Sequence, residues 1–257
     1  MAKTIAMIKS IFLLIVLLSL SCNADKHSEP GFSYHNTYRS VVEIKPPAGY
    51  SRILQDSGSF GEWIRNIRLK SDNHVYLYNG SLKENQSAQF AVLDMPIGKR
   101  DLQQCADAVM RLRAEYLFSQ KKYEQIIFWD NNGKQYKWTG GTDINQFSKY
   151  LENVFGWCGT ASLEKQLKAV KDLKQMRVGD VFIKGDYHGH AMIVIDMAEN
   201  DKGEKIYMLG QSYMPAQDIH IVKNPANKKL SPWYEVSDAE EIVTPEYKFY
   251  KGQLKHW

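Results

Sequence analysis

The sequence predicts an α+β domain in which N-terminal helices pack on an antiparallel sheet. Three observations lead to this fold class. Residues 101–120 carry apolar side chains at helical spacing, residues 180–222 break into short apolar runs separated by turns, and the helical segments precede these runs. Strands that alternated with helices would have indicated a parallel sheet instead.

The clearest helix is expected over residues 101–120, with Asp101 as its N-cap. Its apolar face is formed by Leu102, Cys105, Ala106, Val109, Met110, Leu112, Tyr116 and Leu117. Shorter helices are expected over residues 60–69, 144–155 and 162–176, where apolar residues recur at three- and four-residue intervals.

Strands are expected where apolar runs end at turn residues. Residues 126–129 and 135–138 flank the turn Asp130-Asn-Asn-Gly133 and predict a hairpin. The other expected strands are 74–78, 89–95, 180–184, 190–197, 205–209 and 218–222, the last four forming a meander.

The N-terminus has the composition of an export signal. Lys3 and Lys9 precede the apolar run Ile11–Leu18, which is too short to span a bilayer. We therefore expect residues 1–21 to be a signal peptide and the protein to act outside the cytoplasm.

Cys22 directly follows the expected cleavage point and looks like the lipid acceptor of a bacterial lipobox, although Ser19 stands where Leu is commonest. Two acyl chains would anchor the protein stably to a membrane. The alternative is ordinary secretion with Cys22 as a passenger. Residues 22–39 are expected to be a tether, and residues 40–257 a single domain anchored in the cell envelope.

Composition restricts the partners. The formal net charge is +4 over 257 residues and is spread along the chain, without a basic stripe interleaved with aromatic residues. Nucleic acid is therefore not an expected partner. Gly140-Gly141 is an ordinary turn, and no glycine-rich phosphate loop is present. Trp63, Trp129, Trp138 and Trp157 are most simply packing residues.

Besides Cys22, the chain contains only Cys105 and Cys158. In an oxidising compartment these two could pair as a disulfide. Alternatively, Cys105 is a reactive thiol, because the positive end of a helix stabilises a thiolate. With Asp101 as N-cap, Cys105 would lie one turn inside the helix; a start near Gln104 would place it at the tip. A third interpretation is a buried, inert Cys105 on the apolar face.

Two further residues fit the chemistry of a thiol nucleophile. His190 opens the expected strand 190–197, and Gln211 follows the expected strand 205–209. If these strands pair antiparallel, the start of one lies beside the end of the other. His190 could then serve as the base for Cys105, and Gln211 could orient its imidazole ring.

This order resembles that of papain-like cell-wall cysteine hydrolases: a helix-starting Cys, Gly179-Asp-Val with a strand, a strand opening with His, then a polar residue on the next strand. The resemblance covers residues 100–222. It implies a papain-like fold, with Cys105 as nucleophile, His190 as base and Gln211 as orienting residue. Amidopeptidases and CHAP-type amidases in these families cut peptidoglycan peptides, which implies a cell-wall peptide substrate and no cofactor.

The chain also resembles bacterial lipoproteins that carry a domain of unknown function, a likeness that implies no activity. The segments that carry it are Gly61–Arg65, Val75–Gly80, Asp101–Arg113 and Gln211–Gln217.

Other interpretations of these residues remain open. Cys158 also precedes a helix and is a rival nucleophile. His188 and His190 have the spacing of a zinc pair, with Asp186, Asp218 or His220 nearby. His220 could replace Gln211 as the orienting residue, or be an ordinary surface residue. The leading hypothesis is an envelope-anchored amidase or peptidase; the alternative is a non-catalytic peptide- or glycan-binding protein of the same fold.

Overall fold

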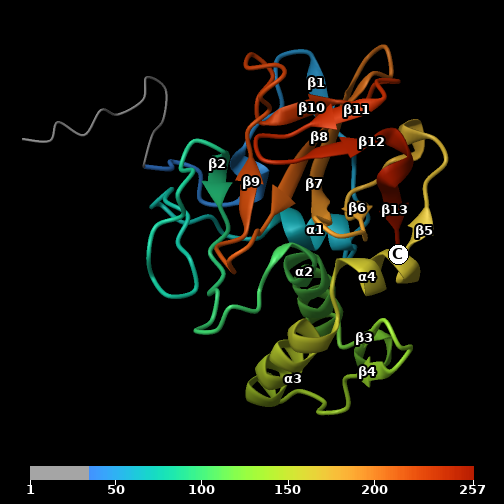
Figure 1. Cartoon of the computed structure of the whole chain (residues 1–257). Coiled ribbons are helices and arrows are strands. Elements are labelled where there is room, and N and C mark those ends of the chain that lie inside the picture. The colour runs from blue at the N-terminus through green and yellow to red at the C-terminus, as the bar shows by residue number, and fades with distance from the viewer. Residues whose placement is uncertain (1–34) are drawn as a thin grey trace, which may run out of the picture. The chain divides into compact units, whose positions relative to one another are not determined.

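The longest strand, β7 (His190–Asn200), is buried along its first nine residues, in agreement with its nearly unbroken apolar sequence. It pairs antiparallel with β6 (Val181–Lys184) on one side and with β8 (Lys205–Gln211) on the other. The computed structural model describes residues 35–257, which form one unit (Figure 1). The expected signal peptide and Cys22 lie outside the described residues.

Within this part of the chain, the main sheet has the order β2-β9-β8-β7-β6-β13-β5, and β1 and β10 pair with β7 and β8. All its pairs are antiparallel. The remaining strands are β1 (Tyr50–Arg52), β2 (Gln89–Val92), β5 (Lys168–Ala169), β9 (His220–Val222), β10 (Trp233–Glu235) and β13 (Leu254–His256). The expected mixture of helices and an antiparallel sheet is confirmed.

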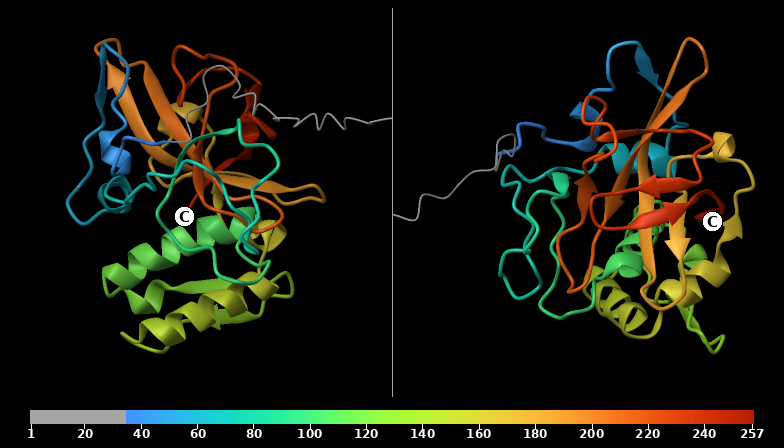
Figure 2. Two further views of the ribbon diagram at one scale, coloured as in Figure 1. Left: turned by 90° about the vertical axis from the view of Figure 1, so that its left-hand side faces the viewer. Right: turned by 45° about the horizontal axis from the view of Figure 1, so that its top comes forward.

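Helices cover one face of this sheet. They are α1 (Phe60–Arg65), α2 (Cys105–Ser119), α3 (Ile144–Trp157) and α4 (Thr160–Gln166). Helices α1 and α2 pack on β7, and α4 packs on β6. Figures 1 and 2 show α2 and α3 together on this side of the strands. The expected hairpin forms as β3 (Ile127–Trp129) and β4 (Gln135–Lys137) beside α4.

A second hairpin, β11 (Glu241–Val243) with β12 (Lys248–Tyr250), covers the other face near β6. Its side chains Ile242 and Phe249 join a separate apolar cluster there. Short 3-10 turns complete the fold: η1 (Val41–Glu43), η2 (Tyr123–Gln125), η3 (Leu173–Gln175) and η4 (Lys251–Gln253).

Successive side chains of β7 point to opposite faces of the sheet and so contribute to the apolar clusters on both faces. Ile193 belongs to the cluster on the helical side, whereas Met192 and Val194 belong to the opposite cluster. A register shift between Val194 and Asp196 interrupts the pairing with β8. Just after this bulge, Asp196 is fully buried and forms ion pairs with Arg52 and Arg65.

Several predicted elements are corrected by the structure. Residues 74–78 make only isolated bridges. The helix predicted over 162–176 ends at Gln166, because the following residues pair as β5 with β13. The helix predicted from Asp101 begins at Cys105.

The expected tether also ends earlier than residue 39. Asn36 is buried, its N–H donates to the carbonyl of Ser71 at 2.8 Å, and its side-chain amide donates to the carbonyl of Lys70 at 3.0 Å. Residues 35–39 therefore belong to the domain. None of the helices between residues 35 and 257 is long and apolar enough to cross a membrane.

Candidate functional site: a cysteine beside a buried histidine

Cys105 is the first residue of α2, and Gln104 is the N-cap. The carboxylate of Asp107 accepts a hydrogen bond from the Gln104 N–H at 3.0 Å, which fixes the entry of the chain into the helix. Because the first-turn N–H groups of a helix lack intrahelical partners, the thiol stands at the positive end of α2.

Cys105 lines a groove of about 750 Å³, although the residue is only 7% exposed. The walls are the start of α2, the Cys158–Thr160 segment and the loop 185–189 between β6 and β7. Tyr187 on that loop is largely exposed, and His188 has a left-handed backbone (φ 59°). A bound molecule in this groove would thus lie beside Cys105.

The environment of Cys105 keeps its thiol protonated at rest. Burial raises the pKa of Cys105, although hydrogen bonding by the backbone N–H of Ala191 opposes this rise. The negative charge of Asp107 raises the pKa further, whereas Thr160 lowers it. Helix α2 packs on β7, so the thiol at its first residue lies near the start of β7, where Ala191 and His190 are located.

His190 is the first residue of β7 and is buried. Its ring centroid lies 4.7 Å from that of Tyr213 and 4.9 Å from that of Tyr247. The residue before it has to be glycine, because a Cβ on Gly189 would come within 2.4 Å of the Lys184 carbonyl oxygen. The imidazole is therefore held between aromatic rings at the end of a tight loop.

Gln211, the last residue of β8, holds one side of this imidazole. The Nε2 atom of His190 lies 2.7 Å from Oε1 of Gln211. Because an amide oxygen only accepts, Nε2 of His190 carries the proton and Nδ1 of the neutral ring is left as the basic nitrogen. The expected antiparallel pairing of the two strands, and the approach of His190 to Gln211, are confirmed.

The amide of Gln211 is itself fixed by two acceptors. Its Nε2 donates to Oε2 of Glu246 at 2.8 Å and lies 3.2 Å from Nε2 of His220. His220 donates from Nδ1 to the carbonyl of Asp218 at 2.9 Å, so its Nε2 is free to accept. This network sets the orientation of Gln211 so that its oxygen faces His190.

Burial also sets the charge of both histidines. It lowers the pKa of His190 to about 4, although the bond to Gln211 works in the opposite direction. Burial and the nearby Lys83 lower the pKa of His220 to about 3. Near neutral pH the imidazole of His190 and the thiol of Cys105 are therefore both uncharged.

The sequence did not predict Glu246 and Tyr247 as site residues. They lie on the turn between β11 and β12, outside residues 100–222, which carry the resemblance to cysteine hydrolases. Glu246 forms an ion pair of 2.6 Å with the largely buried Lys83. The hydroxyl of Tyr247 donates to the carbonyl of His188 at 2.9 Å. The apolar alternation of the C-terminal residues could have indicated a strand there, but not its position over His190.

The alternative sites are less well assembled. Cys158 is the C-cap of α3 and precedes Gly159, the N-cap of α4, so it is not itself part of that helix; burial raises its pKa to about 12. Cys105 and Cys158 are both free, so the expected alternative of a disulfide is wrong. Within residues 35–257, no three His, Cys, Asp or Glu side chains are arranged to hold a metal ion.

The interpretation of His220 as an ordinary surface residue is wrong, because His220 is fully buried. It contacts Gln211 rather than replacing it. Asp218, the other proposed ligand, instead pairs with Lys70 at 2.6 Å. Of the four tryptophans expected to be packing residues, Trp138 packs in the core, whereas Trp157 is 63% exposed.

The comparisons with known proteins give one family match. The family described as "Domain of unknown function (4846)" matches residues 41–144 and 139–256, which is nearly all of the described chain. No curated protein and no solved structure matches this chain.

Proposed function

Because the chain belongs to the family described as "Domain of unknown function (4846)", a description that names no activity, we propose a function from the site itself. The protein is a papain-like cysteine hydrolase that cleaves an amide or related acyl bond, with cell-wall peptide as its substrate class. One observation carries the proposal: a thiol at a helix N-terminus lies against the start of β7, where His190 is oriented by Gln211.

In the proposed reaction, Sγ of Cys105 attacks the substrate carbonyl while Nδ1 of His190 takes the thiol proton. The oxyanion is stabilised by the first N–H groups of α2. The amine leaves with the proton from His190, and a thioester remains on Cys105. Water then attacks the thioester, gives a proton to His190, and releases the acid; that proton returns to the thiol.

The neutral resting pair favours this concerted transfer over a preformed thiolate–imidazolium pair. Gln211 supports it because an amide orients the ring without adding a charge that would protonate it. A substrate in the groove excludes water from the thiol, so the imidazolium and the oxyanion form in a medium of low dielectric constant, where they attract one another strongly.

The experiment is digestion of muropeptides by the purified protein, with products identified by mass spectrometry. Cleavage that is lost in Cys105→Ala and in His190→Ala, and kept in Cys158→Ala, supports the proposal. Cleavage that persists in Cys105→Ala contradicts it. Cys158→Ala is the matched control because both thiols are buried and line the same groove.

A second candidate is supported by the burial of the thiol. Since Cys105 is 7% exposed and its pKa is raised by burial, the groove could also serve a protein that only binds a peptide or glycan. Binding of intact muropeptides with equal affinity by the parent protein and Cys105→Ala, without product formation, would favour this candidate.

We also propose that the protein is exported and held to the cell envelope through lipid on Cys22. The apolar run Ile11–Leu18 and the cysteine after it support this proposal. Expression in a bacterium fed with an alkyne-labelled fatty acid tests it. Label on the parent chain that disappears in Cys22→Ser supports anchoring, and equal label in both, or none in either, contradicts it.

A further inference from the structure

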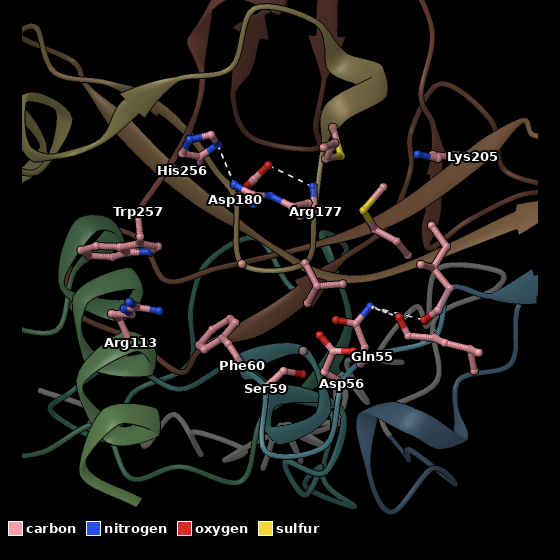
Figure 3. A pocket seen from close by; sticks show the side chains of 17 residues that line it. Gln55, Asp56, Ser59, Phe60, Arg113, Arg177, Asp180, Lys205, His256 and Trp257 are labelled. Atoms are coloured by element: carbon pink, nitrogen blue, oxygen red, sulfur yellow. Dashed lines mark hydrogen bonds between the residues drawn. The ribbon is translucent and has the colours of Figure 1, made fainter. Parts of the chain in front are cut away.

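A second cavity lies away from the Cys105 groove. It has a volume of about 500 Å³ and is bounded by the loop 53–56, the start of α1, the loop 176–180 and the end of the chain after β13 (Figure 3). Lys184 of β6 and His190 of β7 lie at the end of the strands nearest the groove. Asp180, just before β6, and Met197, towards the other end of β7, line this cavity. It is therefore separated from the candidate site by the length of the strands.

The cavity wall contains an arginine without a carboxylate partner. Arg113, two turns along α2 from Cys105, makes no ion pair or side-chain hydrogen bond with any residue of the described chain. Its guanidinium instead lies 5.3 Å from the ring of Trp257 and 5.9 Å from that of Tyr116. Partial burial lowers the pKa of Arg113, and no carboxylate of the described residues pairs with its guanidinium to oppose this shift.

Two other groups of the wall have unused capacity to donate. The guanidinium of Arg177 is bonded to Nδ1 of His256 at 2.9 Å, which offers no negative charge. The buried Nε1–H of Trp257 has no acceptor among residues 35–257. A buried donor is normally paired, so this N–H marks a part of the wall where residues 35–257 leave a polar group unsatisfied.

The charges of the lining favour an anion. Arg113, Arg177 and Lys205 outnumber the two acidic residues, Asp56 and Asp180. Asp56 is exposed at the rim, and Asp180 is already bonded to the backbone N–H of Arg177 at 2.9 Å.

Figure 3 shows Arg113, Trp257 and Arg177 on one side of the cavity and Lys205 on the other. The remaining wall is largely apolar and includes Phe60, Met176 and Met197. An occupant is thus expected to combine a negative group with an apolar body.

We propose that this cavity binds a small organic anion, whose carboxylate or phosphate pairs with the guanidinium of Arg113 and whose apolar part lies against Phe60 and the methionines. A guanidinium holds such planar or tetrahedral anions through two parallel hydrogen bonds. The site is independent of the hydrolytic function proposed for Cys105.

The test is calorimetric titration of the full chain, at constant ionic strength, with four probes: benzoate, phenyl phosphate, inorganic phosphate and uncharged benzyl alcohol. Benzoate and phenyl phosphate are expected to bind and benzyl alcohol is not. Preference for benzoate identifies a carboxylate source, and preference for phenyl phosphate a phosphate source. Inorganic phosphate is expected to bind more weakly than phenyl phosphate, because it lacks the apolar part.

Arg113→Gln is expected to weaken binding of the preferred anion by roughly tenfold or more. The matched control is Arg39→Gln, which removes an equal charge from a side chain that is 89% exposed. Since Arg113 also packs on aromatic rings, Lys205→Gln is a second variant that removes a cation from the opposite wall without disturbing α2, and a several-fold loss is expected. Equal binding of benzyl alcohol, no binding of either aromatic anion, or equal loss in Arg113→Gln and Arg39→Gln overturns the proposal.

Discussion

The side-chain amide of Gln211 donates to Oε2 of Glu246 over 2.8 Å, while the oxygen of the same amide faces Nε2 of His190 at 2.7 Å. A carboxylate accepts hydrogen bonds and cannot donate them. Glu246 therefore prevents the amide of Gln211 from turning its nitrogen toward His190. Gln211, which sets the tautomer of His190, is thus itself held in place by Glu246 of the C-terminal hairpin.

Glu246→Gln is expected to lower cleavage of muropeptides by roughly tenfold or more, because a glutamine at 246 lets Gln211 turn and release His190. It also breaks the ion pair with Lys83, which costs about 3–5 kcal/mol when one partner of a buried pair is removed. Turnover and urea unfolding are measured together.

Lys83→Gln is the control for this prediction, since it breaks the same ion pair but leaves the carboxylate that fixes Gln211. It is expected to lose stability and keep most of its turnover. If the two variants lose turnover equally, after correction for the folded fraction, Glu246 has no orienting role.

The rate at which Cys105 is alkylated should rise with pH through the neutral range. Burial raises the pKa of this thiol, so its reactive thiolate becomes about tenfold more abundant per pH unit below that pKa. Iodoacetamide labelling of Cys158→Ala, with mass spectrometry of the peptide that contains Cys105, measures this thiol separately from Cys22. A flat, fast rate between pH 5 and 8 would instead reveal a preformed thiolate–imidazolium pair and contradict the neutral pair.

The buried histidines should make the fold sensitive to acid. Burial and Lys83 lower the folded-state pKa of His220 to about 3, against an ordinary value of 6.5. Between these values the unfolded chain binds the proton and the folded chain does not, so stability falls as the pH drops from about 6.5 towards 3. The contribution is on the order of a few kcal/mol.

His220→Gln removes this titration while its oxygen can still accept from Gln211. The parent protein is therefore expected to lose more unfolding free energy between pH 7 and pH 4 than His220→Gln does. Comparing the two proteins cancels the opposite contribution of Asp180, whose pKa burial raises to about 6. Parallel stability curves would show that His220 is not protonated on unfolding.

Gly189→Ala should both destabilise the fold and displace His190. A Cβ at this position would lie 2.4 Å from the carbonyl oxygen of Lys184 and 2.5 Å from that of Asp186, so the backbone has to move. We expect a loss of about 1–3 kcal/mol in thermal or urea unfolding, together with slower cleavage. Gly252→Ala is the control, because a Cβ there meets nothing within 4 Å; equal effects would rule out the close approach as the cause.

Asp196 should be among the most sensitive positions in the core. Its two carboxylate oxygens lie 2.7 Å from Nε of Arg52 and from Nε of Arg65, and the residue is fully buried. Asp196→Asn leaves two arginine side chains without their anion and is expected to cost about 3–5 kcal/mol in urea unfolding. Asp201→Asn, on an exposed turn, is the control; a loss below about 1 kcal/mol for Asp196→Asn would contradict the importance of this cluster.

Local patterns in the sequence determined much of the fold and part of the site. The helical spacing after Cys105 gave α2, and the alternation and turns after Asp180 gave β6, β7 and β8 in their observed order. Because consecutive strands joined by a short turn pair antiparallel, the approach of His190 to Gln211 also followed from the sequence. These features depend on residues that are close along the chain.

The tertiary structure decided what depends on distant segments. Residues 168–169 have helical spacing but pair with β13, since a long-range hydrogen-bonded edge outweighs a weak local preference. Glu246 reaches Gln211, and Tyr247 reaches His190, only because the C-terminal hairpin folds over the sheet. The charge state of Cys105 and His190 likewise follows from burial, which is a property of the packed domain and cannot be read from either residue's neighbours in sequence.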